Sequence, residues 1–355
     1  MSNQNDFNVW SKWDPLKKVA IGSCVNPKYF EHVANIEIRE KLQKMVTETQ
    51  EDLDHIADCC TELGVEVIRC NPNHPSIEKR LNPDQKAQAI KWLLYPRDNL
   101  AVLGNHILTT TRDVIIQKYY DFLPPLESKN TAWYDLHVKK GVEFVDPPCW
   151  TLVGKDLFVD FESYKMEKNH FDIVVWQNQI QKWSKKWLPD VRIHWVEIGG
   201  HNDGCFHTVK PGAIISLENI MTYQDTFPGW DVLYLPDQSW GAVHGFLEMK
   251  NKNRGKYWIP GEQNNDQFLN FINTWLDDWL GYVEETVFDV NCLVVNESTV
   301  LVNNYNKEVF AFFKKHKIEP IICPMRHRYF FDGGIHCVSL DLYREGSCQS
   351  YIDYN

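Results

Sequence analysis

A cysteine near the carboxyl end of the chain stands where a nucleophile could form. Cys337 closes the run Gly333-Gly334-Ile335-His336-Cys337 and precedes Val338–Leu342, whose alternating residues predict a strand. A thiol in a glycine-relaxed turn at the mouth of a strand is accessible, but its usual pKa of about 8.5 calls for a stabilising neighbour before it attacks efficiently. His336 is adjacent, yet neighbouring strand residues point to opposite faces, so we do not expect it to be that partner. A purely structural cysteine is the more common case at such a position.

A histidine and a carboxylate two residues apart form a second candidate. His201 and Asp203 follow Gly199-Gly200. If the chain is extended here, both side chains face the same space, and a base lies beside an acid. The glycine pair permits close approach of a ligand. A polar loop with an ordinary surface histidine explains these residues equally well.

Asp98 and Asp146 each stand a few residues before a segment that predicts a hairpin. The two prolines after Asp146 make a turn its simplest explanation. However, Asp98, Asp146, His201 and Cys337 belong to separate repeats of one strand pattern. Equivalent points of repeats that close into a ring converge on its axis. We therefore expect these side chains to meet at one central polar site.

The elements that must position these residues recur along the chain. A strand, Leu16–Ile21, precedes an amphipathic helix, Ile38–Leu63, which Gly64 caps and a buried strand, Val65–Ile68, follows. Four hairpins come next, with strands at 100–103 and 107–110, 151–153 and 157–159, 206–209 and 214–217, and 292–295 and 300–302. After two of them a helix and a lone strand follow, at 169–187 and 191–196, and at 308–316 and 318–323.

This strand-strand-helix-strand repeat predicts a closed, repeat-built α/β domain that spans residues 1–355. The segment Asp237–Gln267 has no clean period and predicts a long loop or a small insertion.

Charge and composition exclude several classes of protein. A net charge of −11 argues against nucleic-acid binding, which needs a concentrated basic surface. No apolar run approaches the length of about 18 to 20 residues that spans a bilayer, and Met1–Asp14 is polar without the apolar core of a signal peptide. The 10 cysteines have no regular spacing, so we expect a reduced, cytoplasmic protein. No local metal-ligand spacing or phosphate loop is present, and we expect neither a metal nor a cofactor.

Taken in order, these residues resemble the arginine:glycine amidinotransferases, a branch of the pentein superfamily of guanidine-modifying enzymes. The resemblance covers nearly the whole chain. It rests on Trp13-Asp14-Pro15-Leu16, Pro96-Arg97-Asp98, Asp146 ahead of Gly154-Lys155-Asp156, His201-Asn202-Asp203, and Gly333 to Cys337 with Leu340-Asp341. It implies a five-bladed α/β propeller of ββαβ-type units around a polar centre, and a homodimer.

The resemblance also implies roles for residues of this chain. Cys337 would attack the guanidinium carbon of the donor, most plainly L-arginine, and release ornithine. Asp146 and Asp203 would hold the guanidinium nitrogens, with Asp98 as a further contact. His201 would protonate the departing amine and later take a proton from the incoming primary amine, glycine or another.

One feature of the family is missing. Its better-known members hold a substrate carboxylate with an arginine, and no arginine stands near the matching position, Ile220. Glu284-Glu285 stand where those members have a serine pair. Arg326 and Arg328 are the candidates to take over the carboxylate, and we choose Arg326 as the substrate-binding residue.

Two other functions fit part of this pattern. A deiminase or dihydrolase of the same superfamily would use the same Cys, His and carboxylates and let water resolve the intermediate. A non-catalytic binding protein on the same fold would lack the cysteine, which is present here.

Overall fold

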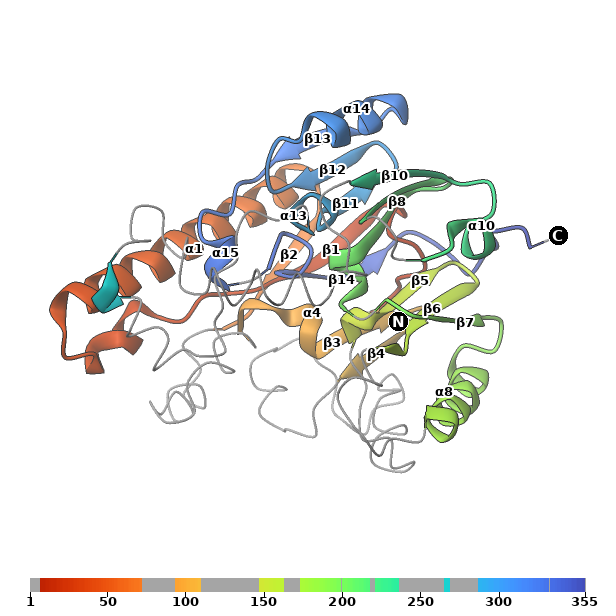
Figure 1. Ribbon diagram of the computed structural model, residues 1–355, viewed down its shortest axis with the longest axis horizontal. Helices are drawn as coiled ribbons and strands as arrows, with labels where there is room; N and C mark the ends of the chain where they lie inside the picture. Colours follow the sequence, from red (N-terminus) through yellow and green to blue (C-terminus); the bar gives the residue numbers. More distant parts are fainter. Residues whose placement is uncertain are drawn as a thin grey trace, which may run out of the picture.

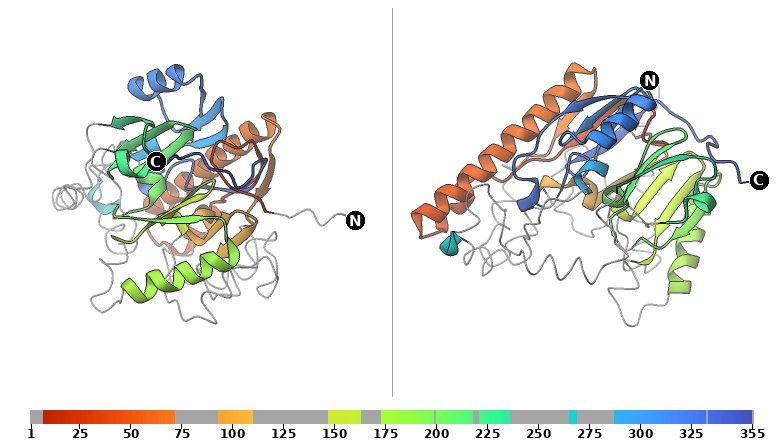
Figure 2. Two further views of the ribbon diagram at one scale, coloured as in Figure 1. Left: turned by 90° about the vertical axis from the view of Figure 1, so that its right-hand side faces the viewer. Right: turned by 45° about the horizontal axis from the view of Figure 1, so that its top comes forward.

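The computed structural model describes residues 7–71, 93–109, 147–162, 173–198, 200–217, 221–235, 265–268, 287–331 and 333–354. These residues form an α/β structure of several small sheets, and three long helices lie at its periphery (Figure 1; Figure 2). In the part of the chain that is described, no helix is long and apolar enough to cross a membrane. All 10 cysteines are free thiols.

The strands belong to five separate sheets within the described residues. Their bounds are β1 Leu16–Ile21, β2 Glu66–Arg69, β3 Leu100–Leu103, β4 His106–Thr109, β5 Trp150–Val153, β6 Asp156–Asp160, β7 Arg192–Val196, β8 Phe206–Lys210, β9 Ala213–Leu217, β10 Asp231–Leu235, β11 Leu293–Asn296, β12 Thr299–Val302, β13 Glu319–Ile322 and β14 Ser339–Arg344. Every hairpin expected from the sequence is present, within one to two residues of its predicted bounds.

One plan is common to the sheets. In the orders β5-β6-β7, β8-β9-β10 and β11-β12-β13, an antiparallel pair is followed by a parallel third strand. The sheet β14-β1-β2 repeats that plan with strands from opposite ends of the sequence, because β1 pairs antiparallel with β14 and parallel with β2. Strands β3 and β4 form an antiparallel pair.

Helices connect the strands. The long ones are α1 Ile36–Glu62, α8 Ile173–Trp187 and α14 Lys307–Lys315, and the short turns are η1 Pro27–His32, α4 Pro96–Asn99, η2 Pro147–Cys149, α9 Asn202–Cys205, α10 Tyr223–Thr226, α13 Val287–Val290 and α15 Arg328–Phe331. Helix α1 begins at the N-cap Asn35, whose side chain accepts from the backbone N–H of Ile38, and Gly64 follows its end at a φ of +79°. Its apolar face is buried from Ile38 to Cys60, whereas Leu63, the last residue of the predicted helix, is exposed at the C-cap.

Two local expectations are wrong. The strand after α1, predicted to be buried, is β2, and its residues are exposed or half-buried because it lies at the edge of its sheet. The segment from His201 to Asp203 is not extended: His201 is the N-cap of α9, and Asp203 lies inside that helical turn. Most of the predicted loop at 237–267 lies outside the described residues.

Candidate active site

Short turns deliver the candidate residues to one place. Asp98 lies in α4 before β3, Asp203 in α9 before β8, and Cys337 directly before Val338 and β14. Helix α9 packs against η2 and α13, while α4 packs against η2 and β14. Residues that are far apart in the sequence therefore meet where the sheets begin.

The structure brings Cys337 and Asp203 together. The Cys337 Sγ lies 3.6 Å from the Asp203 Oδ2, and the same carboxylate oxygen accepts a hydrogen bond of 2.8 Å from the Nδ1 of His336. Cys337 is half-buried, whereas Asp203 and His336 are buried. The thiol proposed as nucleophile and a buried carboxylate thus share one space.

Asn291, which the sequence analysis did not single out, holds this arrangement. It follows α13, and its Nδ2 donates to the Cys337 Sγ at 3.0 Å and to the backbone oxygen of Asp203 at 3.2 Å. Its Oδ1 accepts from the backbone N–H groups of His336 at 2.8 Å and Cys337 at 3.2 Å. A single amide side chain therefore fixes both the thiol and the turn that carries it.

The two glycines before this turn are required by space. A Cβ on Gly334 would lie 2.6 Å from the Asn291 Oδ1 and 2.8 Å from the Asn303 Nδ2, and one on Gly333 would lie 2.5 Å from the ring of Tyr95. Neither glycine has a positive φ. Their role is thus close approach rather than the unusual dihedral angles expected of a glycine-relaxed turn.

Arg97 anchors the turn from the opposite side. Its Nε donates to the backbone oxygens of His336 at 3.0 Å and Ser339 at 2.9 Å, and its Nη2 lies 3.2 Å from the Asp341 Oδ1. Arg97 and Asp341 are both buried. Because Arg97 precedes Asp98, the same short helix supports the nucleophile's turn and presents a carboxylate.

Ionisation follows from burial and neighbours. Burial, with the charges of Arg97 and Lys12, lowers the pKa of His336 well below its usual range, so we assign a neutral ring whose Nδ1–H donates to Asp203. Burial disfavours the Asp203 carboxylate, but the hydrogen bond from His336 and the charges of His201 and Arg97 outweigh it and hold its pKa well below the usual value.

The thiol is neutral in the free protein. Burial first, then the negative charges of Asp203 and Asp98, raise the pKa of Cys337 well above its usual value, and the hydrogen bond from Asn291 opposes them only in part. A cation placed between the two carboxylates would remove this obstacle, since it offsets their charge beside the sulfur.

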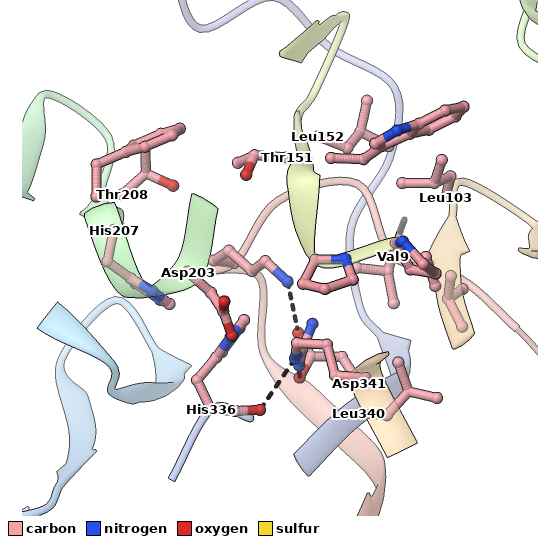
Figure 3. A pocket seen from close by; sticks show the side chains of 18 residues that line it. Val9, Leu103, Thr151, Leu152, Asp203, His207, Thr208, His336, Leu340 and Asp341 are labelled. Atoms are coloured by element: carbon pink, nitrogen blue, oxygen red, sulfur yellow. Dashed lines mark hydrogen bonds and ion pairs between the residues drawn. The ribbon is translucent and has the colours of Figure 1, made fainter. Parts of the chain in front are cut away.

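A cavity of about 30 Å³ with both polar and apolar walls adjoins these residues. Asp203, His207, Thr208, His336 and Asp341 line it, and Figure 3 shows them converging from separate segments. The volume has room for about two water molecules, which is too small for an amino acid, and Cys337 does not line it. Within the described residues, this small space adjoins Asp203 and His336.

The remaining predicted residues lie in different places. His201 is exposed two residues ahead of Asp203, and its protonated form lowers the pKa of that carboxylate. Asp98 is half-buried, and its charge acts on the thiol of Cys337. Asp146 lies outside the described residues, although the turn η2 that follows it packs against α4 and α9.

Arg326 is engaged elsewhere, with helix α1. Its backbone N–H and Nε donate to the Asp52 carboxylate at 2.7 and 2.8 Å, and its Nη2 donates to the Glu51 Oε2 at 2.7 Å and the backbone oxygen of Glu48 at 2.6 Å. The guanidinium already has carboxylate partners, so this geometry does not support the prediction that it holds a substrate carboxylate.

Known proteins of similar sequence cover almost the whole chain. A mitochondrial glycine amidinotransferase from Gallus gallus is 23% identical over an alignment of 402 positions, which covers 97% of this chain and 84% of that protein. An L-arginine:L-lysine amidinotransferase from Pseudomonas savastanoi pv. phaseolicola is 21% identical over 97% of this chain and 96% of its own. No protein-family model matches the chain.

Solved structures of similar fold include two amidinotransferases. SxtG from Microseira wollei, of the saxitoxin biosynthetic pathway, has a TM-score of 0.58 with 18% identity, over 98% of this chain and 100% of that one. The inosamine-phosphate amidinotransferase from Streptomyces griseus has a TM-score of 0.59 with 17% identity, over 98% and 99% of the two chains. Fold, full-length sequence similarity and the group of thiol, carboxylates and histidines agree, and the chain is similar to amidinotransferases over almost its whole length.

Proposed function

We propose that this amidinotransferase transfers the amidino group of a guanidine donor, L-arginine, to a primary amine through a covalent intermediate on Cys337. The observation that carries the proposal is the position of the Cys337 Sγ, which lies 3.6 Å from the Asp203 carboxylate. The negative charge of Asp98 also acts on this thiol and raises its pKa. A planar cation with several N–H donors is complementary to such a site, because each carboxylate accepts charge-assisted hydrogen bonds from it.

The donor would help to activate its own nucleophile. A guanidinium held between Asp203 and Asp98 offsets the two charges that raise the pKa of the thiol, so ionisation of Cys337 becomes easier once the donor is bound. We assign Asp146 to the same guanidinium on the strength of the sequence pattern.

The first half of the reaction would form the intermediate. The thiol proton passes to His201 as the Cys337 Sγ forms a bond to the guanidinium carbon. The bond from that carbon to the alkyl nitrogen then breaks, and His201 gives its proton to the departing amine, ornithine. A cationic amidino-thioether remains on Cys337, beside Asp203.

The second half would reverse these roles. His201 takes a proton from the incoming amine, whose nitrogen attacks the amidino carbon. The carbon–sulfur bond then breaks, and His201 returns the proton to the sulfur, which restores the thiol and the neutral imidazole. The names of the two relatives indicate different acceptors, glycine and L-lysine. We propose a primary-amine acceptor and leave glycine as one candidate among others.

The fold supports this assembly. We propose that the five sheets are the blades of one closed propeller within a single domain of residues 1–355, with the site at its centre. The pairing of β1 with β14 supports closure, because it joins the two ends of the sequence. The homodimer and the cytoplasmic location stay predictions.

The intact mass of the protein after incubation with L-arginine tests the proposal. We expect an adduct of amidino mass on the Cys337 peptide with release of ornithine, no adduct in Cys337→Ala, and an unchanged adduct in Cys348→Ser. Decay of the adduct accelerated by amines supports transfer. Production of citrulline or ammonia at full rate without any amine would identify a hydrolase instead.

A further inference from the structure

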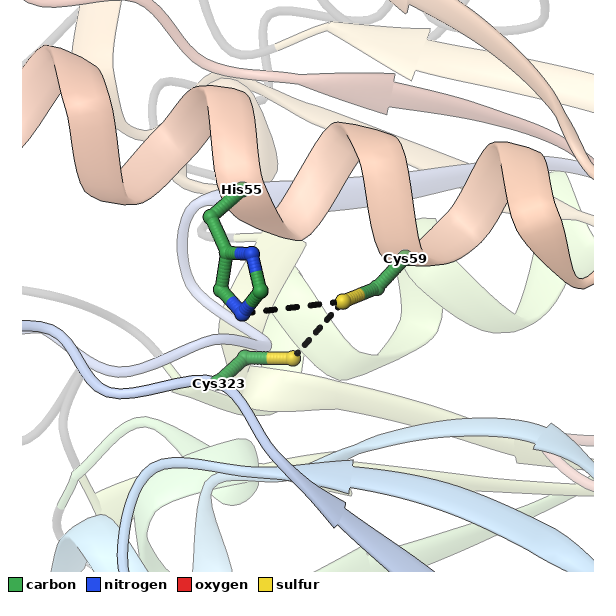
Figure 4. Close-up of side chains that lie close together, drawn as sticks. All are labelled: His55, Cys59 and Cys323. Carbon is green, nitrogen blue, oxygen red and sulfur yellow. Dashed lines mark hydrogen bonds between the residues drawn. The ribbon is translucent and has the colours of Figure 1, made fainter.

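A group of three metal-ligating side chains lies outside the site described above. His55 and Cys59 stand on α1, and Cys323 directly follows β13 (Figure 4). His55 is exposed, Cys59 is half-buried and Cys323 is buried. The proposed amidino transfer uses none of them.

The spacing of their ligand atoms matches a tetrahedral metal centre. The Cys59 Sγ lies 3.8 Å from the His55 Nε2 and 3.6 Å from the Cys323 Sγ, and the three atoms all lie within 4.8 Å of one another. A zinc ion with bonds of about 2.3 Å to sulfur and about 2.0 Å to nitrogen separates its ligands by about 3.8 Å between sulfurs and about 3.5 Å between sulfur and nitrogen. A small shift of side chains would bring the third pair of ligand atoms, on His55 and Cys323, to the same separation.

Two of the ligands are positioned before any ion binds. His55 and Cys59 are four residues apart, so they occupy successive turns on one face of the long helix α1. Only Cys323 must come from elsewhere, and strand β13 fixes its place. Local spacing alone does not reveal this set, since Cys323 is distant in sequence. For that reason the expectation of no metal, which rested on local motifs, did not consider it.

The surroundings suit a cation with an affinity for sulfur. Asp58 precedes Cys59 on the exposed side of α1, and its charge favours a cation over an anion, whereas Asp54 pairs with Arg69 at 3.0 Å. The Cys323 thiol is otherwise difficult to ionise, because burial raises its pKa well above its usual value. A bound cation removes that obstacle, since it takes the thiolate as a ligand.

We propose that His55, Cys59 and Cys323 bind one thiophilic divalent cation of the zinc class, with the fourth position open to solvent beside the exposed histidine. Binding releases two protons, one from each thiol, and leaves the imidazole neutral. The ion would tie α1 to the segment that runs from β13 through α15 to the turn of Cys337. Its role is structural, and it is independent of the proposed transferase activity.

Cobalt(II), which adopts the same geometry and absorbs visible light, tests the proposal on the reduced full-length chain. We expect one equivalent to give the intense bands of a tetrahedral site with thiolate-to-metal charge transfer. These bands should vanish in His55→Ala combined with Cys59→Ser, both accessible positions that leave the core intact. They should persist in Cys337→Ala and Cys348→Ser, which remove the thiols of the proposed active site and of a half-exposed position.

Thermal unfolding gives a second readout. Zinc should raise the Tm of the wild type and of Cys337→Ala in a concentration-dependent manner, and should leave the double variant unchanged. Three outcomes would each overturn the proposal. The cobalt spectrum could show only weak octahedral bands, or wild type and double variant could bind the metal equally well. Cys59 and Cys323 could also form a disulfide that persists under reducing conditions. None of these outcomes bears on amidino transfer, which the mass of the Cys337 adduct tests separately.

Discussion

The Nδ2 of Asn291 lies 3.0 Å from the Sγ of Cys337, and the Oδ1 of the same amide accepts the backbone N–H of Cys337 at 3.2 Å. One side chain thus holds the candidate nucleophile by its sulfur and by its backbone. Asn291 is itself fixed, because the Asn303 Nδ2 donates to its backbone oxygen at 2.8 Å and the Asn303 Oδ1 accepts from Ile335 at 3.1 Å. Rigid support of this kind preserves the attack geometry.

Replacing Asn291 with alanine should lower kcat/KM about 10- to 100-fold. The variant loses hydrogen bonds worth about 1 to 3 kcal/mol that orient the thiol, and each 1.4 kcal/mol, roughly, is a factor of ten in rate. Steady-state kinetics with L-arginine and an amine acceptor measures the loss. Asn296→Ala, at the far end of β11, is the matched control and should behave as wild type. Wild-type kcat/KM in Asn291→Ala would exclude the positioning role.

Replacing Asp203 with asparagine should change thiol reactivity and turnover in opposite directions. Removing a negative charge beside the sulfur lowers the pKa of Cys337, so alkylation of the free protein by iodoacetamide near neutral pH should become faster. Turnover should fall about 10- to 100-fold, since the guanidinium loses a charged hydrogen bond. Peptide mapping after timed alkylation follows the thiol. The control is Asp225→Asn, an exposed change in α10, which should alter neither the alkylation rate nor turnover. Slower alkylation in Asp203→Asn would contradict the view that the charge of Asp203 raises the pKa of Cys337.

Lys12 should make the stability of the protein rise with pH above neutrality. Burial first, then the charge of Arg97, lowers its pKa to about 7, although Asp341 lies 3.6 Å away. The unfolded chain binds this proton up to a pH of about 10, so it holds more protons than the folded chain between about 7 and 10, and the free energy of unfolding increases over that window. Urea unfolding at both ends of the window measures the rise.

Lys12→Met should show a smaller rise than the wild type, because the titrating group is gone. Lys17→Met removes a half-exposed lysine that pairs with Glu345 on the surface, and it should keep the wild-type pH dependence. The same rise in Lys12→Met and in the wild type would show that Lys12 is not the group responsible.

Arg326→Ala should affect stability more than substrate binding. The guanidinium bonds to Asp52 and Glu51 of α1, but it is 41% exposed, so its loss should cost only about 1 kcal/mol. We expect KM for the donor to stay within about twofold of wild type, as a contact remote from the reacting atoms implies. A rise in KM of tenfold or more with unchanged stability would restore the prediction that Arg326 binds a substrate carboxylate.

The sequence was most informative where a repeat and a reactive residue type coincide. Cys337 and Asp203 were predicted to share a site from their order along the repeated hairpins, and the structure places them in contact. Asn291 occupies the matching position before the hairpin of β11 and β12. No candidate had been assigned to that hairpin, although the other hairpins each had one, and this gap was the signal that could have revealed Asn291. An asparagine before a strand is too common for its type alone to reveal a role.

Other features depended on packing that no local pattern contains. The contact of His336 was missed because the residue was assumed to belong to a strand. Strand β14 begins only at Ser339, and His336 lies in the preceding turn, where it donates to Asp203. The sequence identified Arg97 only as part of a motif and did not reveal its partners. Arg97 donates to the backbone oxygens of His336 and Ser339, which lie about 240 residues away along the chain, where no local pattern could indicate them. The extended geometry assumed for His201 failed because the chain starts a helical turn there.

The pairing of β1 with β14, in which Val19 lies opposite Asp341, also sets an order of assembly during synthesis. The ribosome releases β1 and β2 long before it synthesises β14. Until then, the edge of β1 that pairs with β14 has no antiparallel partner. An unpaired edge of this kind invites contact with other chains, and closing so long a loop is slow. The turn that carries Cys337 directly precedes β14, so the thiol takes up its position only when that last strand docks. A chain that stalls or is cut before β14 therefore lacks the strand that holds the turn of Cys337 in place.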